Sequence, residues 1–143
     1  MRVVFDTNVL LSAFLWKKRL KPIYQAIREG TLIPCFTSET WGELLRTLSY
    51  KKLKKQLQKI DVTPEEIIKL LSSRAYFTTS RYKVTLIKKD PSDNYFLACA
   101  LSAQADFIIT GDHLLQELKQ FQGIPILSPK EFLKNYKKLL KRK

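Results

Sequence analysis

The stretch Arg2-Val3-Val4-Phe5-Asp6 is an apolar run that ends in a carboxylate, and Phe107-Ile108-Ile109-Thr110-Gly111-Asp112 has the same design near the other end of the chain. Short apolar runs that end at turn residues are typical of strands buried on both faces of a parallel sheet. The same pattern predicts strands at residues 32–36 and 124–127, and residues 76–79 are expected to form a short extended run. Helical segments between these strands favour βαβ units, so the predicted fold class is α/β with a mainly parallel sheet.

Capping residues and apolar periodicity predict the helices. Two of them open with capping boxes, Thr63-Pro64-Glu65-Glu66 and Ser128-Pro129-Lys130-Glu131. Another helix is expected to run from Pro91 to about Gln104, with Asp90 as its cap. Further helices are expected at residues 22–29 and 38–50, and residues 9–16 are expected to form either a helix or a turn followed by a short helix. The helix at 38–50 carries four apolar side chains on one face: Trp41, Leu44, Leu45 and Leu48.

The composition limits the class of protein and its partners. The chain has 143 residues, which fits one domain, and 26 Lys and Arg residues against 13 acids give a net charge of +13. This excess favours nucleic acid as the partner, while an acidic protein stays open and a membrane surface is less favoured. The longest uncharged run, Asn94–Ala105, is too short to cross a bilayer. No signal peptide is evident, so we expect a cytoplasmic protein.

The two cysteines, Cys35 and Cys99, lie in separate apolar segments. Buried free thiols are therefore the expected state. With a single histidine in the chain, a structural zinc site is not expected.

Four acids stand out as candidates for a common site: Asp6, Glu43, Asp93 and Asp112. Asp6 and Asp112 follow strands, and sites in open α/β sheets form outside the carboxyl ends of the strands. Asp106 precedes the strand that Asp112 follows, so at about 3.3 Å per residue it should lie about 20 Å away. Asp106 is therefore excluded from the candidate site.

Each of the four acids also has a simpler structural explanation. Asp6 and Asp112 suit turns, and Asp93 suits the positive N-terminal end of a helix dipole. Glu43 points away from the apolar face of its helix, so it faces either solvent or a groove, and the sequence leaves both open.

Four converging carboxylates would repel one another without a cation. Magnesium or manganese suits such a set, because these ions bind a few carboxylates together with water. A metal of this kind activates water and stabilises an in-line displacement at phosphorus. The chain has no Gly-rich nucleotide loop and no serine nucleophile motif.

Basic residues are grouped in runs, and at least one run is expected to bind the nucleic-acid backbone in a salt-sensitive way. The run that carries this prediction consists of Lys51, Lys52, Lys54 and Lys55. Other basic residues cluster before Asp90 and after Pro129. Tyr50, Tyr76 and Tyr82 lie near the basic groups and either stack on bases or belong to the core.

The ordered set of motifs resembles the PIN domain family, in particular the small VapC-like toxins of prokaryotes. The resemblance rests on Val4-Phe5-Asp6-Thr7-Asn8, on Glu43 within its helix, on Asp93-Asn94-Tyr95-Phe96-Leu97-Ala98 and on Asp106 through Asp112. It implies a three-layer α/β/α sandwich with a central, mainly parallel sheet. One PIN-like domain would then span residues 1–143 and end in a basic helix at about 129–143.

The resemblance also implies a function. It predicts a Mg²⁺- or Mn²⁺-dependent endoribonuclease that cleaves single-stranded RNA, with Asp6, Glu43, Asp93 and Asp112 as catalytic residues. Asp6, Asp93 and Asp112 would hold the metal, and Asn8 and Thr110 would support them. Relatives of this kind are toxins with a cognate antitoxin, and many form homodimers.

Two other functions stay open at this stage. One is a non-catalytic RNA-binding module on the same fold, which the basic runs support. The other is a phospho-acceptor domain with Asp6 as nucleophile, although Asn8 stands where such a domain would need a second aspartate.

Overall fold

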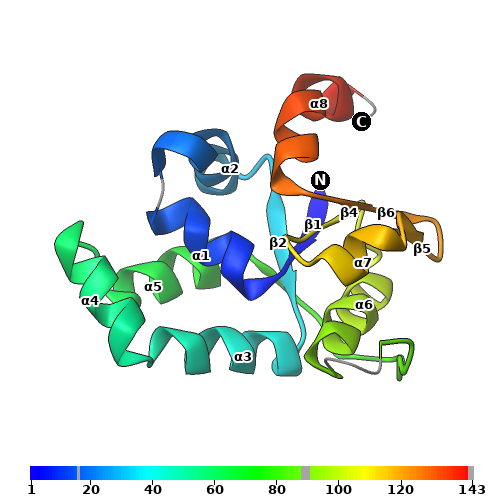
Figure 1. The fold of residues 1–143 in the computed structure, drawn as a ribbon, viewed down its shortest axis with the longest axis horizontal. Coiled ribbons are helices and arrows are strands. Elements are labelled where there is room, and N and C mark those ends of the chain that lie inside the picture. Colours follow the sequence, from blue (N-terminus) through cyan, green and yellow to red (C-terminus); the bar gives the residue numbers. More distant parts are fainter. Residues whose placement is uncertain (16, 88–90, 142–143) are drawn as a thin grey trace.

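The computed structural model describes residues 1–15, 17–87 and 91–141 and contains a central sheet (Figure 1). The strand order is β3-β2-β1-β4-β6-β5, and every neighbouring pair is parallel except β5, which runs antiparallel to β6 at one edge. Helices cover both faces, so the predicted three-layer α/β/α sandwich is confirmed. The strands are β1 (Arg2–Phe5), β2 (Ile33–Phe36), β3 (Tyr76–Phe77), β4 (Phe107–Ile109), β5 (Gln120–Phe121) and β6 (Ile124–Leu127).

The central strands are buried on both faces, as the unbroken apolar runs predict. In β1, Val3 and Phe5 belong to one apolar core, whereas Val4 between them belongs to the other. Strand β4 divides in the same way, with Ile109 in the first core and Ile108 in the second. This alternation follows from the two-residue period of a strand.

Among the described residues, α6 and α7 are the helices that contribute to the second core, and the other helices contribute to the first. Helix α3 packs against α1 on one side and α6 on the other, so it lies where the two helical layers meet (Figure 1). The helices are α1 (Thr7–Leu15), α2 (Lys17–Glu29), α3 (Ser38–Leu48), α4 (Lys51–Lys59), α5 (Pro64–Arg74), α6 (Pro91–Ala103), α7 (His113–Glu117) and α8 (Pro129–Lys141).

The predicted capping box of α8 is confirmed, and Thr63 is confirmed as the N-cap of α5. The Thr63 hydroxyl accepts a hydrogen bond from the Glu66 amide at 3.1 Å. In α8 the Ser128 hydroxyl accepts from the Glu131 amide at 3.0 Å, and the Ser128 amide donates to Glu131 Oε1 at 3.1 Å. The predicted Asp90 cap of α6 lies outside the described residues.

Several elements differ from the prediction. Helix α2 begins at Lys17 instead of Pro22, but its backbone is non-helical at Leu20, so the proline lies near the start of a second helical segment. Helices α4 and α7 and strand β5 were not predicted. In α3, Leu45 is 38% exposed, so the apolar face of this helix is narrower than its sequence indicated.

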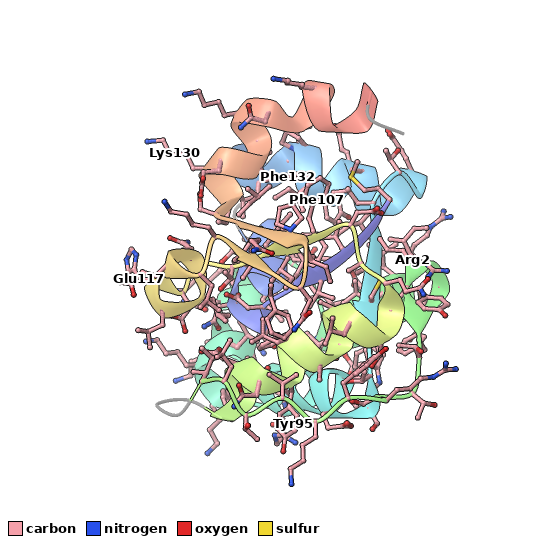
Figure 2. All side chains as sticks on the ribbon, turned by 90° about the vertical axis from the view of Figure 1, so that its right-hand side faces the viewer. Arg2, Tyr95, Phe107, Glu117, Lys130 and Phe132 are labelled. Atoms are coloured by element: carbon pink, nitrogen blue, oxygen red, sulfur yellow. The ribbon has the colours of Figure 1, made fainter. Side chains whose placement is uncertain are left out.

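An aromatic contact fixes helix α8 to the sheet. Phe132 is fully buried, and its ring meets Phe107 of β4 in an edge-on arrangement with centroids 6.4 Å apart (Figure 2). Helix α8 also packs against α2 and β6. The first turn of α8 is therefore held in a defined position above the sheet.

Cys35 of β2 and Cys99 of α6 are buried free thiols, as predicted. Burial raises the pKa of Cys35 to about 12 and that of Cys99 to about 11. Both thiols therefore stay protonated and unreactive near neutral pH. None of the helices in the described ranges has the length and apolar character needed to cross a membrane.

Candidate functional site

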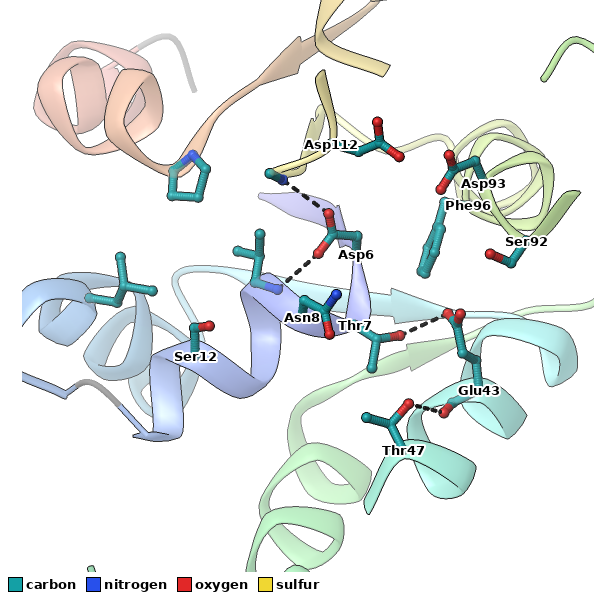
Figure 3. Close-up of a pocket in the computed structure, with 14 residues that line it drawn as sticks. Asp6, Thr7, Asn8, Ser12, Glu43, Thr47, Ser92, Asp93, Phe96 and Asp112 are labelled. Atoms are coloured by element: carbon teal, nitrogen blue, oxygen red, sulfur yellow. Dashed lines mark hydrogen bonds between the residues drawn. The ribbon is translucent and has the colours of Figure 1, made fainter. Parts of the chain in front are cut away.

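The four candidate acids come from four separate elements and line one cavity of about 670 Å³ (Figure 3). Asp6 follows β1, Glu43 lies on α3, Asp93 lies in the first turn of α6, and Asp112 is the N-cap of α7. Asp6 and Asp112 stand beyond the carboxyl ends of the neighbouring parallel strands β1 and β4. The polarity of these strands therefore brings together residues that are far apart in sequence.

Asp6 is held in one orientation by three hydrogen-bond donors. Its Oδ1 accepts from the Val9 amide at 2.8 Å, and its Oδ2 accepts from the Gly111 amide at 3.0 Å and from the Thr110 hydroxyl. A carboxylate offers about four acceptor positions, two on each oxygen. The two donors fill Oδ2, whereas Oδ1 keeps one position for a further ligand.

Thr110 connects the two aspartates that follow the strands. Its fully buried hydroxyl donates to Asp6 and accepts from the Asp112 amide at 3.0 Å. Its carbonyl accepts from Gln116 Nε2 at 2.7 Å. The residue therefore fixes the loop that carries Asp112 relative to Asp6. The sequence singled out Thr110 but gave no indication of Gln116.

The structure resolves the direction of Glu43, which faces the cavity. Its Oε2 accepts a hydrogen bond from the Thr7 hydroxyl at 2.8 Å, and the Thr47 hydroxyl donates to its backbone carbonyl at 2.9 Å (Figure 3). Thr7 is buried and directly follows Asp6 in the chain. The Thr7 hydroxyl therefore links the end of β1 to Glu43 on α3.

Asp93 and Asp112 face each other across the cavity (Figure 3). Asp93 is only 5% exposed, and its place in the first turn of α6 puts it near the positive end of that helix dipole. Asp112 caps α7, since its Oδ1 accepts from the Leu114 amide at 2.8 Å. The structural explanations of Asp93 and Asp112 therefore hold, and both side chains also line the cavity.

Other polar candidates occupy different positions. Asn8 is exposed and lies beside Asp6 at the cavity (Figure 3). The single histidine of the chain, His113, is exposed and lines a separate hollow. Asp106 is far from the site, because its Oδ2 accepts from the amide of Arg2 at the start of β1, at 2.9 Å. The exclusion of Asp106 from the site is therefore correct.

The predicted nucleic-acid contacts on α4 do not adjoin the acids. The predicted contacts are four exposed lysines of α4: Lys51, Lys52, Lys54 and Lys55. No residue of α4 lines the cavity. Among the tyrosines, Tyr50 and Tyr82 are exposed, whereas the ring of Tyr76 lies beneath the Arg2 guanidinium, with 4.1 Å from its central carbon to the ring centroid.

The donor set suits a hard divalent cation. Every candidate ligand is a carboxylate, and oxygen ligands favour magnesium or manganese over zinc or copper. Within the described residues, no three His, Cys, Asp or Glu side chains are grouped closely enough to enclose an ion by themselves. An ion held by these acids would therefore complete its coordination with water, as magnesium does.

Fold and site together define an α/β/α domain with a carboxylate-lined cavity at the carboxyl edge of its sheet. The chain belongs to the PIN domain family, whose sequence pattern matches residues 2–114. Its fold is also similar to a chain in the crystal structure of VapBC2 from Rickettsia felis bound to a DNA fragment from their promoter. The two share 15% sequence identity with a TM-score of 0.57 over 89% of this chain and 97% of that one. No curated protein matches the chain.

Proposed function

We propose that this protein is a divalent-metal-dependent endoribonuclease that cleaves single-stranded RNA. PIN domains are generally nucleases. The observation that carries the proposal is the convergence of four carboxylates on one cavity in a chain of net charge +13. A polyanionic substrate would be attracted by the net positive charge of the chain, and a cation between the substrate and the four acids would neutralise the acids.

Asp6, Asp93 and Asp112 would hold Mg²⁺ or Mn²⁺. When bound, the metal lowers the pKa of a water molecule and neutralises charge that develops on the phosphate. Asp6 would use the acceptor position left on Oδ1, because two donors already occupy Oδ2. Thr110 keeps Asp6 and Asp112 in a fixed relation, so the ligands are positioned before the metal binds.

Glu43 would act as general base or would orient the attacking water. The Thr7 hydroxyl binds its Oε2, which leaves Oε1 to receive a proton. This hydrogen bond also holds the carboxylate toward the cavity. Asn8 would support the site by donating its side-chain amide to a phosphate oxygen.

The α4 lysines would contact the RNA backbone away from the cut phosphate. They are exposed and outside the cavity, so their contribution would be general electrostatic attraction.

We also propose that the protein is the toxin component of a toxin–antitoxin system. The support is its likeness in fold to a chain of the VapBC2 structure from Rickettsia felis. Its partner would be a cognate antitoxin protein, the protein would form a homodimer, and it would act in the cytoplasm.

The test is cleavage of a labelled single-stranded RNA with manganese, with magnesium and with EDTA. Wild type should cut with either metal and not with EDTA, and Asp6→Asn should not cut at all. Asp61→Asn is the matched control, because Asp61 is exposed and its left-handed backbone (φ 59°) is one that asparagine accepts. Full activity of a folded Asp6→Asn protein would refute the mechanism. Binding without cutting would favour the non-catalytic RNA-binding module.

A further inference from the structure

Two basic helices meet at the rim of the acid cavity. Leu20 of α2 and Pro129 of α8 both line it, and the two helices pack against each other (Figure 1). The next residue in each helix, Lys21 and Lys130, is an exposed lysine. Positive charge therefore stands beside the cavity on two adjoining elements.

A row of lysines begins at that rim and continues along helix α8. Lys130, Lys134 and Lys138 are spaced four residues apart, and all three are exposed. This spacing puts them on one side of the helix, about 6 Å apart along its axis. None of the three forms an ion pair with another described residue. The acid of this helix, Glu131, is engaged in the capping box.

The opposite side of α8 is packed against the rest of the fold, which holds the lysine face in a fixed position. Phe132 is fully buried against Phe107, with the ring centroids 6.4 Å apart, and α8 also contacts α2 and β6. The lysines are therefore presented from a fixed support, in which less ordering is needed on binding. The whole helix lies beyond residues 2–114, the part that matches the PIN family.

We propose that the lysine face of α8, together with Lys21 of α2, binds the phosphate backbone of the RNA strand next to the phosphate that is cut. We call this set, Lys21, Lys130, Lys134 and Lys138, the α8 surface. The inference rests on the proposed function, since it assumes an RNA substrate at the acid cavity. Carboxylates repel a polyanion, so cations at the rim would offset that repulsion where the strand enters.

Helix α4 is the natural comparison, because it is just as basic. It carries five lysines and no acid, and all five lysines are exposed. It lines no part of the cavity, however. If position beside the site matters, neutralising α8 must weaken RNA binding more than neutralising α4, although both changes remove the same charge.

The experiment measures the Kd of wild type for a labelled single-stranded RNA in EDTA, over a series of salt concentrations. One variant carries Lys130→Gln, Lys134→Gln and Lys138→Gln, and the control carries Lys51→Gln, Lys52→Gln and Lys55→Gln. Glutamine keeps a long side chain of good helix propensity. The α8 variant should bind about tenfold more weakly near 0.1 M salt, with a log–log salt slope shallower by about 2. The α4 variant should lose less affinity, about threefold, because its lysines contact the RNA backbone away from the cavity and only part of them would be engaged.

Equal losses in the two variants, a larger loss in the α4 variant, or no RNA binding by wild type would each overturn the proposal. Polyglutamate that displaces RNA at equal charge concentration would assign the α8 surface to an acidic protein instead. Because binding is measured in EDTA, the result is separate from catalysis. If wild type cuts RNA but the α8 variant binds RNA as tightly as wild type, the α8 proposal fails and the nuclease proposal stands. If the α8 variant alone loses RNA affinity but wild type cuts no RNA, the nuclease proposal fails and the α8 surface remains an RNA-binding surface.

Discussion

The two ends of strands β1 and β4 use their carboxylates in opposite ways. At the amino end, Asp106 accepts from the Arg2 amide, and the Arg2 guanidinium donates to the Ala103 carbonyl at 2.9 Å and lies over the Tyr76 ring. At the carboxyl end, Asp6 is also held by donors, but it lines a cavity with three other acids.

This difference teaches that strand polarity separates a structural aspartate from a candidate catalytic one. At the amino edge the acid closes a network within the fold. At the carboxyl edge the loops diverge, so the acids meet around a space that a ligand can enter. Changes at the carboxyl edge should therefore act on catalysis, and changes elsewhere should act on stability.

After Asp6→Asn, the largest effect is expected from Asp93→Asn. Removing this charge should reduce cleavage about 10³-fold, because charge stabilisation by a bound metal is worth several kcal/mol. Calorimetric titration with Mn²⁺ should show weaker binding, while Tm stays within a few degrees of wild type. Unchanged Mn²⁺ affinity in a folded variant would show that Asp93 is not a ligand.

A smaller effect is expected from Thr110→Val, which keeps the shape of the buried side chain but removes its hydroxyl. Asp6 loses one donor, and the Asp112 amide loses its acceptor. Cleavage should fall about 10- to 100-fold, as for other residues that orient metal ligands.

Thr110→Ser is the control for this change, because it retains the hydroxyl and should recover most of the activity. If the serine variant were as impaired as the valine variant, packing rather than hydrogen bonding would be the function of Thr110.

The smallest effect is expected from the buried thiols, which lie in the second core and not at the site. Their folded-state pKa values exceed the ordinary value of 9.0, so folding favours the protonated form. Their contribution to stability is complete below pH 9 and is lost as the pH rises toward 11 to 12. Between pH 8 and pH 10.5, Tm should fall less in a Cys35→Ala, Cys99→Ala variant than in wild type. An equal fall would show that other groups cause it.

Much of this arrangement follows from the sequence, because the apolar runs and the turn residues after them state both strand position and polarity. That is why Asp6 and Asp112 could be placed together and Asp106 excluded. The direction of Glu43 could not be predicted, since a helical wheel leaves solvent and groove equally open. It depends on Thr7, whose partner lies 36 residues away in the chain.

Helix α4 was missed for a different reason. Its lysines predict binding to the nucleic-acid backbone, but no secondary structure was predicted for this segment. Leu53 and Leu57, spaced four apart and both buried, were the signal for an amphipathic helix. The position of α8 beside the cavity was equally unpredictable, because it depends on the long-range contact between Phe132 and Phe107.

The most direct test of the central claim compares the same substitution at the two ends of the paired strands. Asp6→Asn and Asp106→Asn would be assayed for Mn²⁺-dependent RNA cleavage per folded molecule, with Tm measured for each. We predict that Asp6→Asn abolishes cleavage with a modest change in Tm, whereas Asp106→Asn lowers Tm and leaves cleavage by the folded protein intact. Equal cleavage by both variants, or loss only in Asp106→Asn, would contradict the account.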